Sequence, residues 1–207
     1  MSEEIEKYFI EDQDAYYIKN GKRFCRSVHF RDRTRFNKAK EQSEIPPVDV
    51  ETIIIYVNEL LEKLDMSKMD NARFENPLPI NYGKLKEDYR MNSESDLIWM
   101  KFTKDGYLGV VACSNDINFD IPQKEEDYNA KVKRLNNYTK EYEDAWKHYT
   151  SGVLVHSVDK SWDESFVLIF PSINIPDGYS KKHIETAIGK YLIEKGVPII
   201  DFYSHNY

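Results

Sequence analysis

The chain has 207 residues, of which 41% are hydrophobic, 14% aromatic and 31% charged, and its formal net charge is −7. So many aromatic rings exclude a generally disordered chain, and the length is sufficient to bury a core without disulfides. With only Cys25 and Cys113, no apolar run near the length of a membrane span and no signal-peptide core, a reducing cytoplasmic setting without a membrane partner is favoured.

The first half of the chain predicts a hairpin and a helix separated by long connections. Residues 14–30 are typical of a β-hairpin, because Asn20-Gly21 is a strong turn signal between β-branched and aromatic residues. Residues 31–48 are expected to form a connector that ends at two prolines. Asp49 then caps a helix of about 16 residues with one apolar stripe, and the polar residues 66–95 predict a long loop.

The second half predicts two further hairpins and two further helices. Residues 96–114 form the second hairpin, closed by Lys104-Asp105-Gly106. A tyrosine-rich helical period follows Pro122 and runs to Gly152. The apolar runs 153–158 and 165–171 predict the third hairpin, Ser180 caps a last helix, and 197–203 is a final strand.

This order of elements predicts a single α+β domain over residues 1–207. The expected fold is a mostly antiparallel sheet built from three hairpins, with about three helices packed on it. If strands 165–171 and 197–203 are parallel neighbours, their helical crossover should be right-handed.

Two stretches hold clustered titratable residues. The sequence HSVDKSWDES contains His156, Asp159 and Asp163, and the tail contains Asp201 and His205. If these stretches converge, a small metal-dependent hydrolase or nuclease is one hypothesis, with imidazole and carboxylates around one cleft. The simpler interpretation is a half-buried histidine beside solvated loop residues. No HxH, HExxH or phosphate-loop pattern is present, so we predict no metal site and no cofactor.

The charge distribution is the most uneven feature of the sequence. Nine basic residues and one acid lie between Lys19 and Lys40, a net charge of +8 that leaves −15 for the rest of the chain. A solvated edge strand would explain alternating charges but does not require a single sign. Arg31, Arg33 and Arg35 would share one side of an extended chain. Aromatic residues interleave with the basic residues in and around this segment: Tyr16, Tyr17, Phe24, Phe30 and Phe36.

The favoured hypothesis is therefore a non-catalytic cytoplasmic binding protein of a regulatory, immunity-like or anti-defence type. Its basic segment would contact an acidic protein or a nucleic acid, and a nucleic-acid-associated accessory role is a further alternative. The chain's own acidic remainder is a competing ligand for the same cations. The expected contact residues are Lys22, Arg23, Arg26, Arg31, Arg33, Arg35, Phe30 and Phe36.

Overall fold

The computed structural model describes residues 16–19, 22–25, 28–69, 72–75, 84, 87, 97–114, 131–136, 139–146, 151–161 and 166–201. Within these ranges, the side chains of 16–34, 72–75, 114, 145 and 146 are not described. The described helices are α2 (Val28–Ser43), α3 (Val50–Lys63), α6 (Ser151–Ser157) and α7 (Lys181–Glu194). The described strands are β1 (Tyr16–Lys19), β2 (Lys22–Cys25), β3 (Ala72–Glu75), β4 (Leu97–Phe102), β5 (Leu108–Ser114), β6 (Lys131–Leu135), β7 (Tyr142–Trp146) and β8 (Phe166–Pro171).

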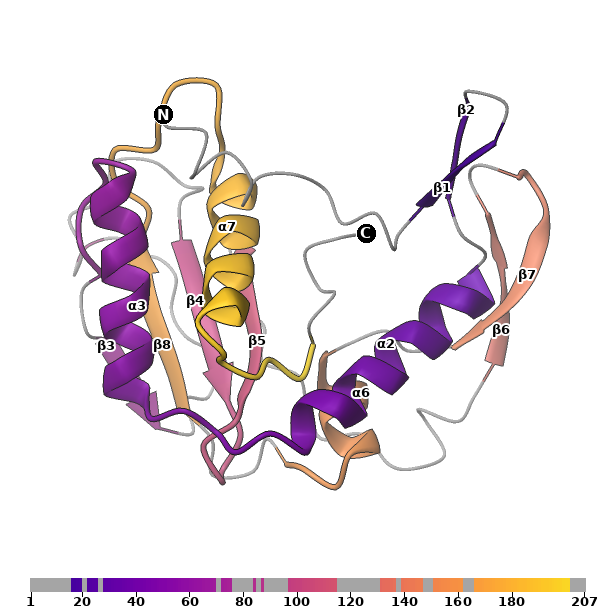
Figure 1. Cartoon of the computed structure of the whole chain (residues 1–207), viewed down its shortest axis with the longest axis horizontal. Coiled ribbons are helices and arrows are strands. Elements are labelled where there is room, and N and C mark those ends of the chain that lie inside the picture. The colour runs from indigo at the N-terminus through magenta and orange to yellow at the C-terminus, as the bar shows by residue number, and fades with distance from the viewer. Residues whose placement is uncertain are drawn as a thin grey trace.

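The fold is α+β with antiparallel sheets, as the sequence predicts. Four strands form the central sheet in the order β3-β8-β4-β5, and every neighbouring pair in it is antiparallel. The pairs β1-β2 and β6-β7 form separate two-stranded sheets. Figure 1 shows the central sheet with α3 and α7 on one side of the molecule, and α2, α6 and β6-β7 on the other.

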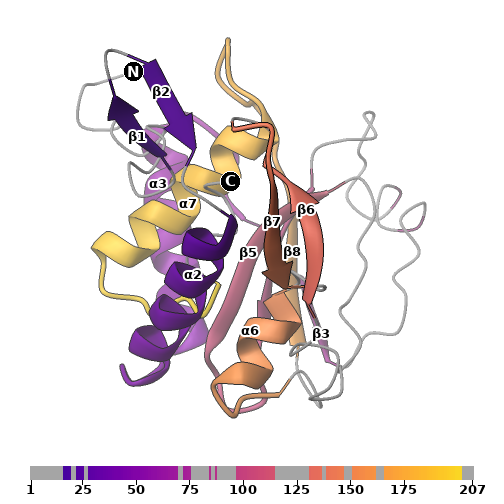
Figure 2. The same ribbon diagram turned by 90° about the vertical axis from the view of Figure 1, so that its right-hand side faces the viewer.

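The main core lies between the central sheet and the helices α3 and α7. Alternate residues of the strands point to this face, including Ile98, Met100 and Phe102 of β4. They meet the buried stripe of α3, represented by Leu60 and Leu61. Figure 2, the view from the right-hand side, shows these two helices lying together along one face of the sheet.

A second, smaller core joins α2 and α6 to the edge strand β5. It contains Ala39 of α2, Val110 of β5, Leu154 and Val155 of α6, and Ile200 near the end of the described chain. Because these residues come from four separate parts of the sequence, this core fixes how α2 and α6 sit against the central sheet.

Several sequence predictions are confirmed. The strand pairs β1-β2 and β4-β5 form hairpins where expected, and Gly106 closes the second with φ +88, a conformation that favours glycine. Asp49 caps α3 by accepting a hydrogen bond from the Thr52 amide at 2.8 Å. Helix α7 begins after Ser180, as predicted.

The predicted connector 31–48 is wrong, because most of it is helix α2. Arginine, lysine, glutamate and glutamine are good helix formers, and the helix ends before the two prolines. On a helix, positions 31 and 33 lie about 200° apart, so the three arginine positions do not share one side.

The predicted helix between Pro122 and Gly152 is also wrong. The described part of this region contains β6 and β7, paired from Lys131↔Trp146 to Leu135↔Tyr142. The turn between them depends on Asn136, whose side-chain oxygen accepts from the Thr139 amide at 3.2 Å. Asparagine favours turns through such bonds, and that signal is stronger here than the helical spacing of the apolar residues.

The predicted third hairpin is replaced by one helix and one strand. Residues 153–158 fall largely in α6, whereas β8 lies where a strand was expected. A short apolar run fits a buried helix as well as a buried strand, so its period does not decide between them.

Two smaller predictions change as well. The predicted loop 66–95 contains β3, which pairs with β8. Of the predicted strand 197–203, the described residues 197–201 form one parallel bridge, between Ile199 and Leu108 of β5. Strand β8 lies between β3 and β4 instead, so the premise of the right-handed crossover is not met. None of the described helices combines the length and the apolar character needed to cross a membrane.

Candidate functional site

Helix α2 carries most of the residues expected to contact a partner. Arg26 lies outside the described residues. For five further residues the structure describes the backbone but not the side chain: Lys22, Arg23, Phe30, Arg31 and Arg33. The described half of the helix shows Arg35, Phe36, Lys38 and Lys40, so the prediction can be compared with the structure there.

Arg35 does not face outward. Its Nη2 donates to both carboxylate oxygens of Asp201, at 3.0 Å to Oδ1 and 2.9 Å to Oδ2. Only 10% of the Arg35 side chain and 2% of the Asp201 side chain are exposed. A charge-assisted pair of this kind offsets part of the cost of burying two ions, each of which would be costly if left alone. Arg35 is therefore held by the chain's own acid, as the competing interpretation of the basic segment required.

Phe36 is likewise turned into the protein. It packs against the second core beside Ala39. The expectation that Phe36 is an exposed aromatic within the basic segment is therefore not met, and its ring stabilises the position of α2.

Asp201 sits where three elements meet. Its amide donates to the carbonyl of Gly109 at 2.8 Å, which attaches this segment to β5. The hydroxyl of Ser151, at the start of α6, donates to Asp201 Oδ2 at 2.7 Å. The amide of Ile199 donates to Oε1 of Gln42 on α2 at 3.1 Å. Asp201 thus connects α2 and α6 through its carboxylate and β5 through its amide, which is a structural role.

No hydrogen bond or ion pair in the described part of the chain joins His156 to Asp201, whose carboxylate bonds to Arg35 and Ser151. His156 lies in the last turn of α6, and its buried Nε2 makes no hydrogen bond to the described residues. Asp159 is exposed, with φ 56 just after the helix. Asp163 and His205 lie outside the described residues, so the hydrolase or nuclease hypothesis stays a prediction. Among the residues that the structure describes, no three His, Cys, Asp or Glu side chains form a metal-binding group.

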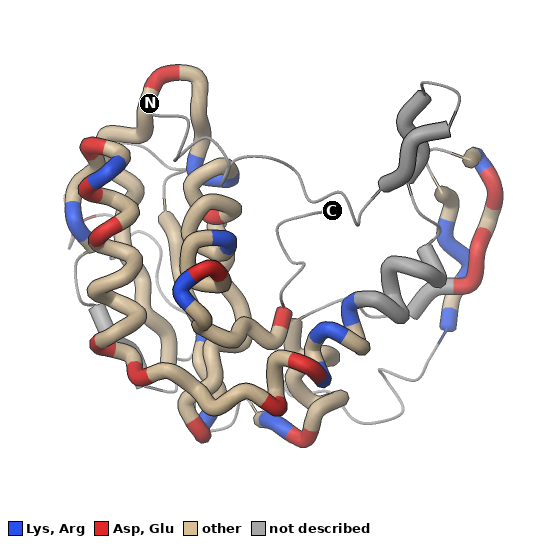
Figure 3. Tube along the Cα trace, viewed as in Figure 1, with Lys and Arg blue, Asp and Glu red and all other residues tan. Residues whose placement is uncertain are grey.

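The outer side of α2 remains cationic. Lys40 is exposed, and Lys38 forms a surface pair with Glu41, 3.0 Å from Nζ to Oε2. Such exposed pairs are worth about 0–1 kcal/mol, so they are easily exchanged for another anion. Figure 3 shows Lys and Arg positions on the described half of α2 and on β6.

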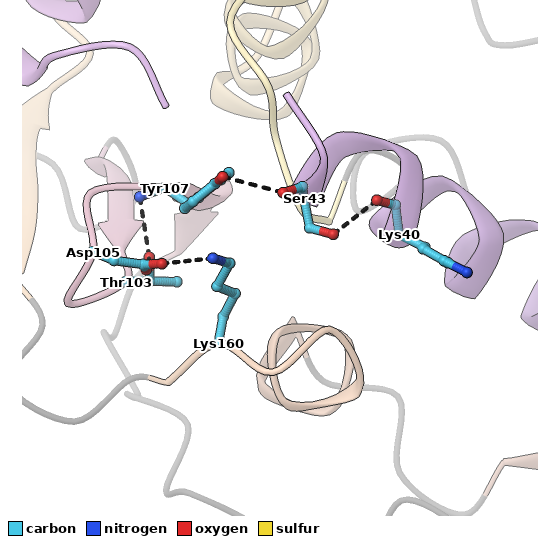
Figure 4. Close-up of polar contacts among 6 residues, drawn as sticks. All are labelled: Lys40, Ser43, Thr103, Asp105, Tyr107 and Lys160. Atoms are coloured by element: carbon cyan, nitrogen blue, oxygen red, sulfur yellow. Dashed lines mark hydrogen bonds and ion pairs between the residues drawn. The ribbon is translucent and has the colours of Figure 1, made fainter. Parts of the chain in front are cut away.

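A second polar network holds the carboxyl end of α2 against the β4-β5 turn (Figure 4). The Tyr107 hydroxyl donates to the Ser43 carbonyl at 3.1 Å, and the Tyr107 amide donates to Thr103 Oγ1 at 3.0 Å. Asp105 accepts from Thr103 Oγ1 and from Lys160 Nζ, both at 2.6 Å. Lys160 also lies 4.1 Å from the centre of the Tyr107 ring, a cation–π contact.

The Asp105 network predicts a small loss of stability in acid. Burial would raise the pKa of Asp105, but hydrogen bonds from Lys160 and Thr103 and the charge of Lys160 outweigh it and lower the pKa below 3.8. A lowered folded-state pKa stabilises the protein above the unfolded-state value, and this stabilisation is lost as pH falls through the folded-state value. The free energy of unfolding of Asp105→Asn should therefore lie below that of the parent at pH 7, by at most about 1 kcal/mol, and the difference should shrink below about pH 4. Urea denaturation of both proteins between pH 3 and 7 measures this, and a difference that is constant with pH would contradict it.

The cysteine that the structure describes is not an activated nucleophile. Burial and, to a smaller extent, the neighbouring Glu185 carboxylate together raise the pKa of Cys113 to about 12. The thiol packs against the main core, as expected for a small hydrophobic residue.

Sequence reasoning missed several residues that hold α2 in place. Gln42, Ser151 and Lys160 bond to partners between 50 and 157 positions away, and no local pattern signals such contacts. No protein-family model, curated protein or solved structure matches the chain, so the functional argument rests on the residues themselves.

Proposed function

We propose that this protein acts by binding a negatively charged partner, in a cytoplasmic setting, through the basic segment 19–40. The observation that carries the proposal is the separation of charge: +8 in this segment against −15 in the rest of the chain. A local concentration of positive charge attracts a negatively charged partner and accelerates its association. Regulatory, immunity-like or anti-defence roles are compatible with such a protein.

The contact set differs from the one expected from sequence. The proposed contacts no longer include Arg35 and Phe36. Arg35 is paired with Asp201 inside the protein, and Phe36 packs against the smaller core. Lys38 and Lys40 on the outer side of α2 join Lys22, Arg23, Arg26, Arg31 and Arg33 as the proposed contacts.

Retention on heparin, a defined polyanion, tests this proposal. Because the whole chain carries −7, retention at low salt requires a local concentration of cations. The parent should be retained, and a variant with Lys22, Arg23, Arg31 and Arg33 all changed to Glu should flow through.

A matched control makes the test specific. Changing Lys68, Lys84, Lys104 and Lys182 to Glu alters the net charge by the same amount at exposed positions outside the segment. This control should stay on the column at a slightly lower salt concentration. Equal loss of retention in both variants, or no retention of the parent, would overturn the proposal.

A further inference from the structure

The hairpin β6-β7 has an open face of unusual composition. Along β6, Lys131, Lys133 and Leu135 are exposed, whereas the residues between them are half-buried. Leu135 is paired directly with Tyr142 of β7. These two side chains are 44% and 69% exposed. The strand period of two therefore places lysines, an aliphatic side chain and a tyrosine ring on one exposed face.

This face is not explained by the packing of the described residues. Five large hydrophobic side chains are strongly exposed in the part of the chain that is described, and Leu135 and Tyr142 are the two that are direct cross-strand neighbours. Single exposed apolar side chains are common, but a contiguous apolar pair beside cations suggests a contact surface.

We infer that this face is a stacking platform for single-stranded nucleic acid, which names the partner class and rests on the proposed function. Tyr142 would stack on a base, while Lys131 and Lys133 contact phosphates. The two lysines are separated by about 6.6 Å along the strand, so they follow an extended backbone. Double-stranded nucleic acid would provide phosphates for the two lysines, but its stacked bases offer no free face to the tyrosine ring.

The ion pair between Lys133 and Asp144 does not oppose the inference. Lys133 Nζ lies 2.6 Å from Asp144 Oδ1, but both side chains are 66% exposed. Exposed pairs contribute little, so a phosphate can replace the carboxylate at small cost.

The hairpin lies next to the basic segment. Helix α2 contacts β7, so the cationic helix and the hairpin are neighbours in the fold. Figure 3 shows basic positions on both α2 and β6 in this part of the structure. A flexible single strand can contact both, whereas a partner bound only by charge would need only the helix.

Fluorescence anisotropy of the full-length chain tests the inference. The probes are labelled 12-nucleotide oligo-dT and oligo-U, a 12-base-pair duplex, and a labelled polyglutamate peptide, each at two salt concentrations. Tyr142→Ala should weaken binding of the single strands about 10-fold or more, and Tyr142→Phe should retain binding because the ring remains. Tyr179→Ala is the control for loss of a tyrosine outside the hairpin and should leave affinity unchanged. Lys131→Glu with Lys133→Glu should reduce the salt slope by about 1.4.

The outcomes separate this inference from the proposed function. If single strands do not bind at low salt, if Tyr142→Ala binds them normally, or if polyglutamate or duplex binds as tightly, the stacking platform is overturned. Should heparin retention still depend on the basic segment in that case, the proposed function stands without the platform. If the segment variant binds heparin like the parent, the proposed function itself fails.

Discussion

Replacing Asp201 by alanine is expected to lower the free energy of unfolding by about 3–5 kcal/mol. The change leaves the Arg35 guanidinium in a buried position without its carboxylate partner, and an uncompensated buried charge is strongly destabilising. The same substitution removes the acceptor of the Ser151 hydroxyl at the start of α6. The measurement is chemical denaturation of the parent and the variant at pH 7.

The double variant Arg35→Met with Asp201→Leu distinguishes the loss of the pair from other effects. Replacing both charges by apolar side chains removes the desolvation cost as well as the attraction, so the double variant should be markedly more stable than Asp201→Ala. Lys38→Ala is the matched control for loss of a cation on the same helix, and it should change stability by less than about 1 kcal/mol. Equal destabilisation by Asp201→Ala and Lys38→Ala would show that the buried pair does not hold α2.

The long-range contacts of α2 also explain why residues 31–48 were predicted to be a connector and not a helix. The inner side of α2 includes Arg35, Phe36, Ala39 and Gln42, which follow helical spacing. Two of these four are polar, so a search for apolar periodicity does not detect the stripe. Their partners, Asp201 and the Ile199 amide, lie more than 150 positions away, and only the folded chain brings them together.

The elements that sequence did predict have local causes. Asp49 caps α3 through Thr52, Gly106 has the positive φ that its turn needs, and the stripe of α3 is apolar throughout its buried face. Among the elements that were missed, α6 and β6-β7 have patterns compatible with either helix or strand. Tertiary packing decides between these alternatives, in α6 by burying Val153, Leu154 and Val155 together.

In the candidate site, too, some features have local causes in the sequence and others depend on tertiary packing. Clustering of charge was visible in the sequence, but which cations face the solvent depends on the fold. Arg35 and Lys40 are five positions apart and both positively charged, yet one is buried against a carboxylate and the other is exposed. Tyr142 lies in the region predicted to be a tyrosine-rich helix, and its exposure became apparent only from the structure, where it lies on β7.

Replacing Phe102 by alanine is expected to destabilise the protein by about 3–5 kcal/mol through the main core. Phe102 is fully buried at the end of β4, and its ring stacks on Phe166 of β8 with centroids 4.6 Å apart. The substitution removes the buried apolar area, leaves a cavity and breaks an aromatic pair worth about 0.5–1.5 kcal/mol beyond area burial. Ile55→Ala, at a position that is 56% exposed on α3, should change stability by about 0.5 kcal/mol or less. Denaturant midpoints of both variants and of Phe102→Leu measure the effect, and Phe102→Leu should fall between them because it refills part of the cavity. A Phe102→Ala midpoint close to that of Ile55→Ala would mean that the β4-β8 contact does not belong to the cooperative core.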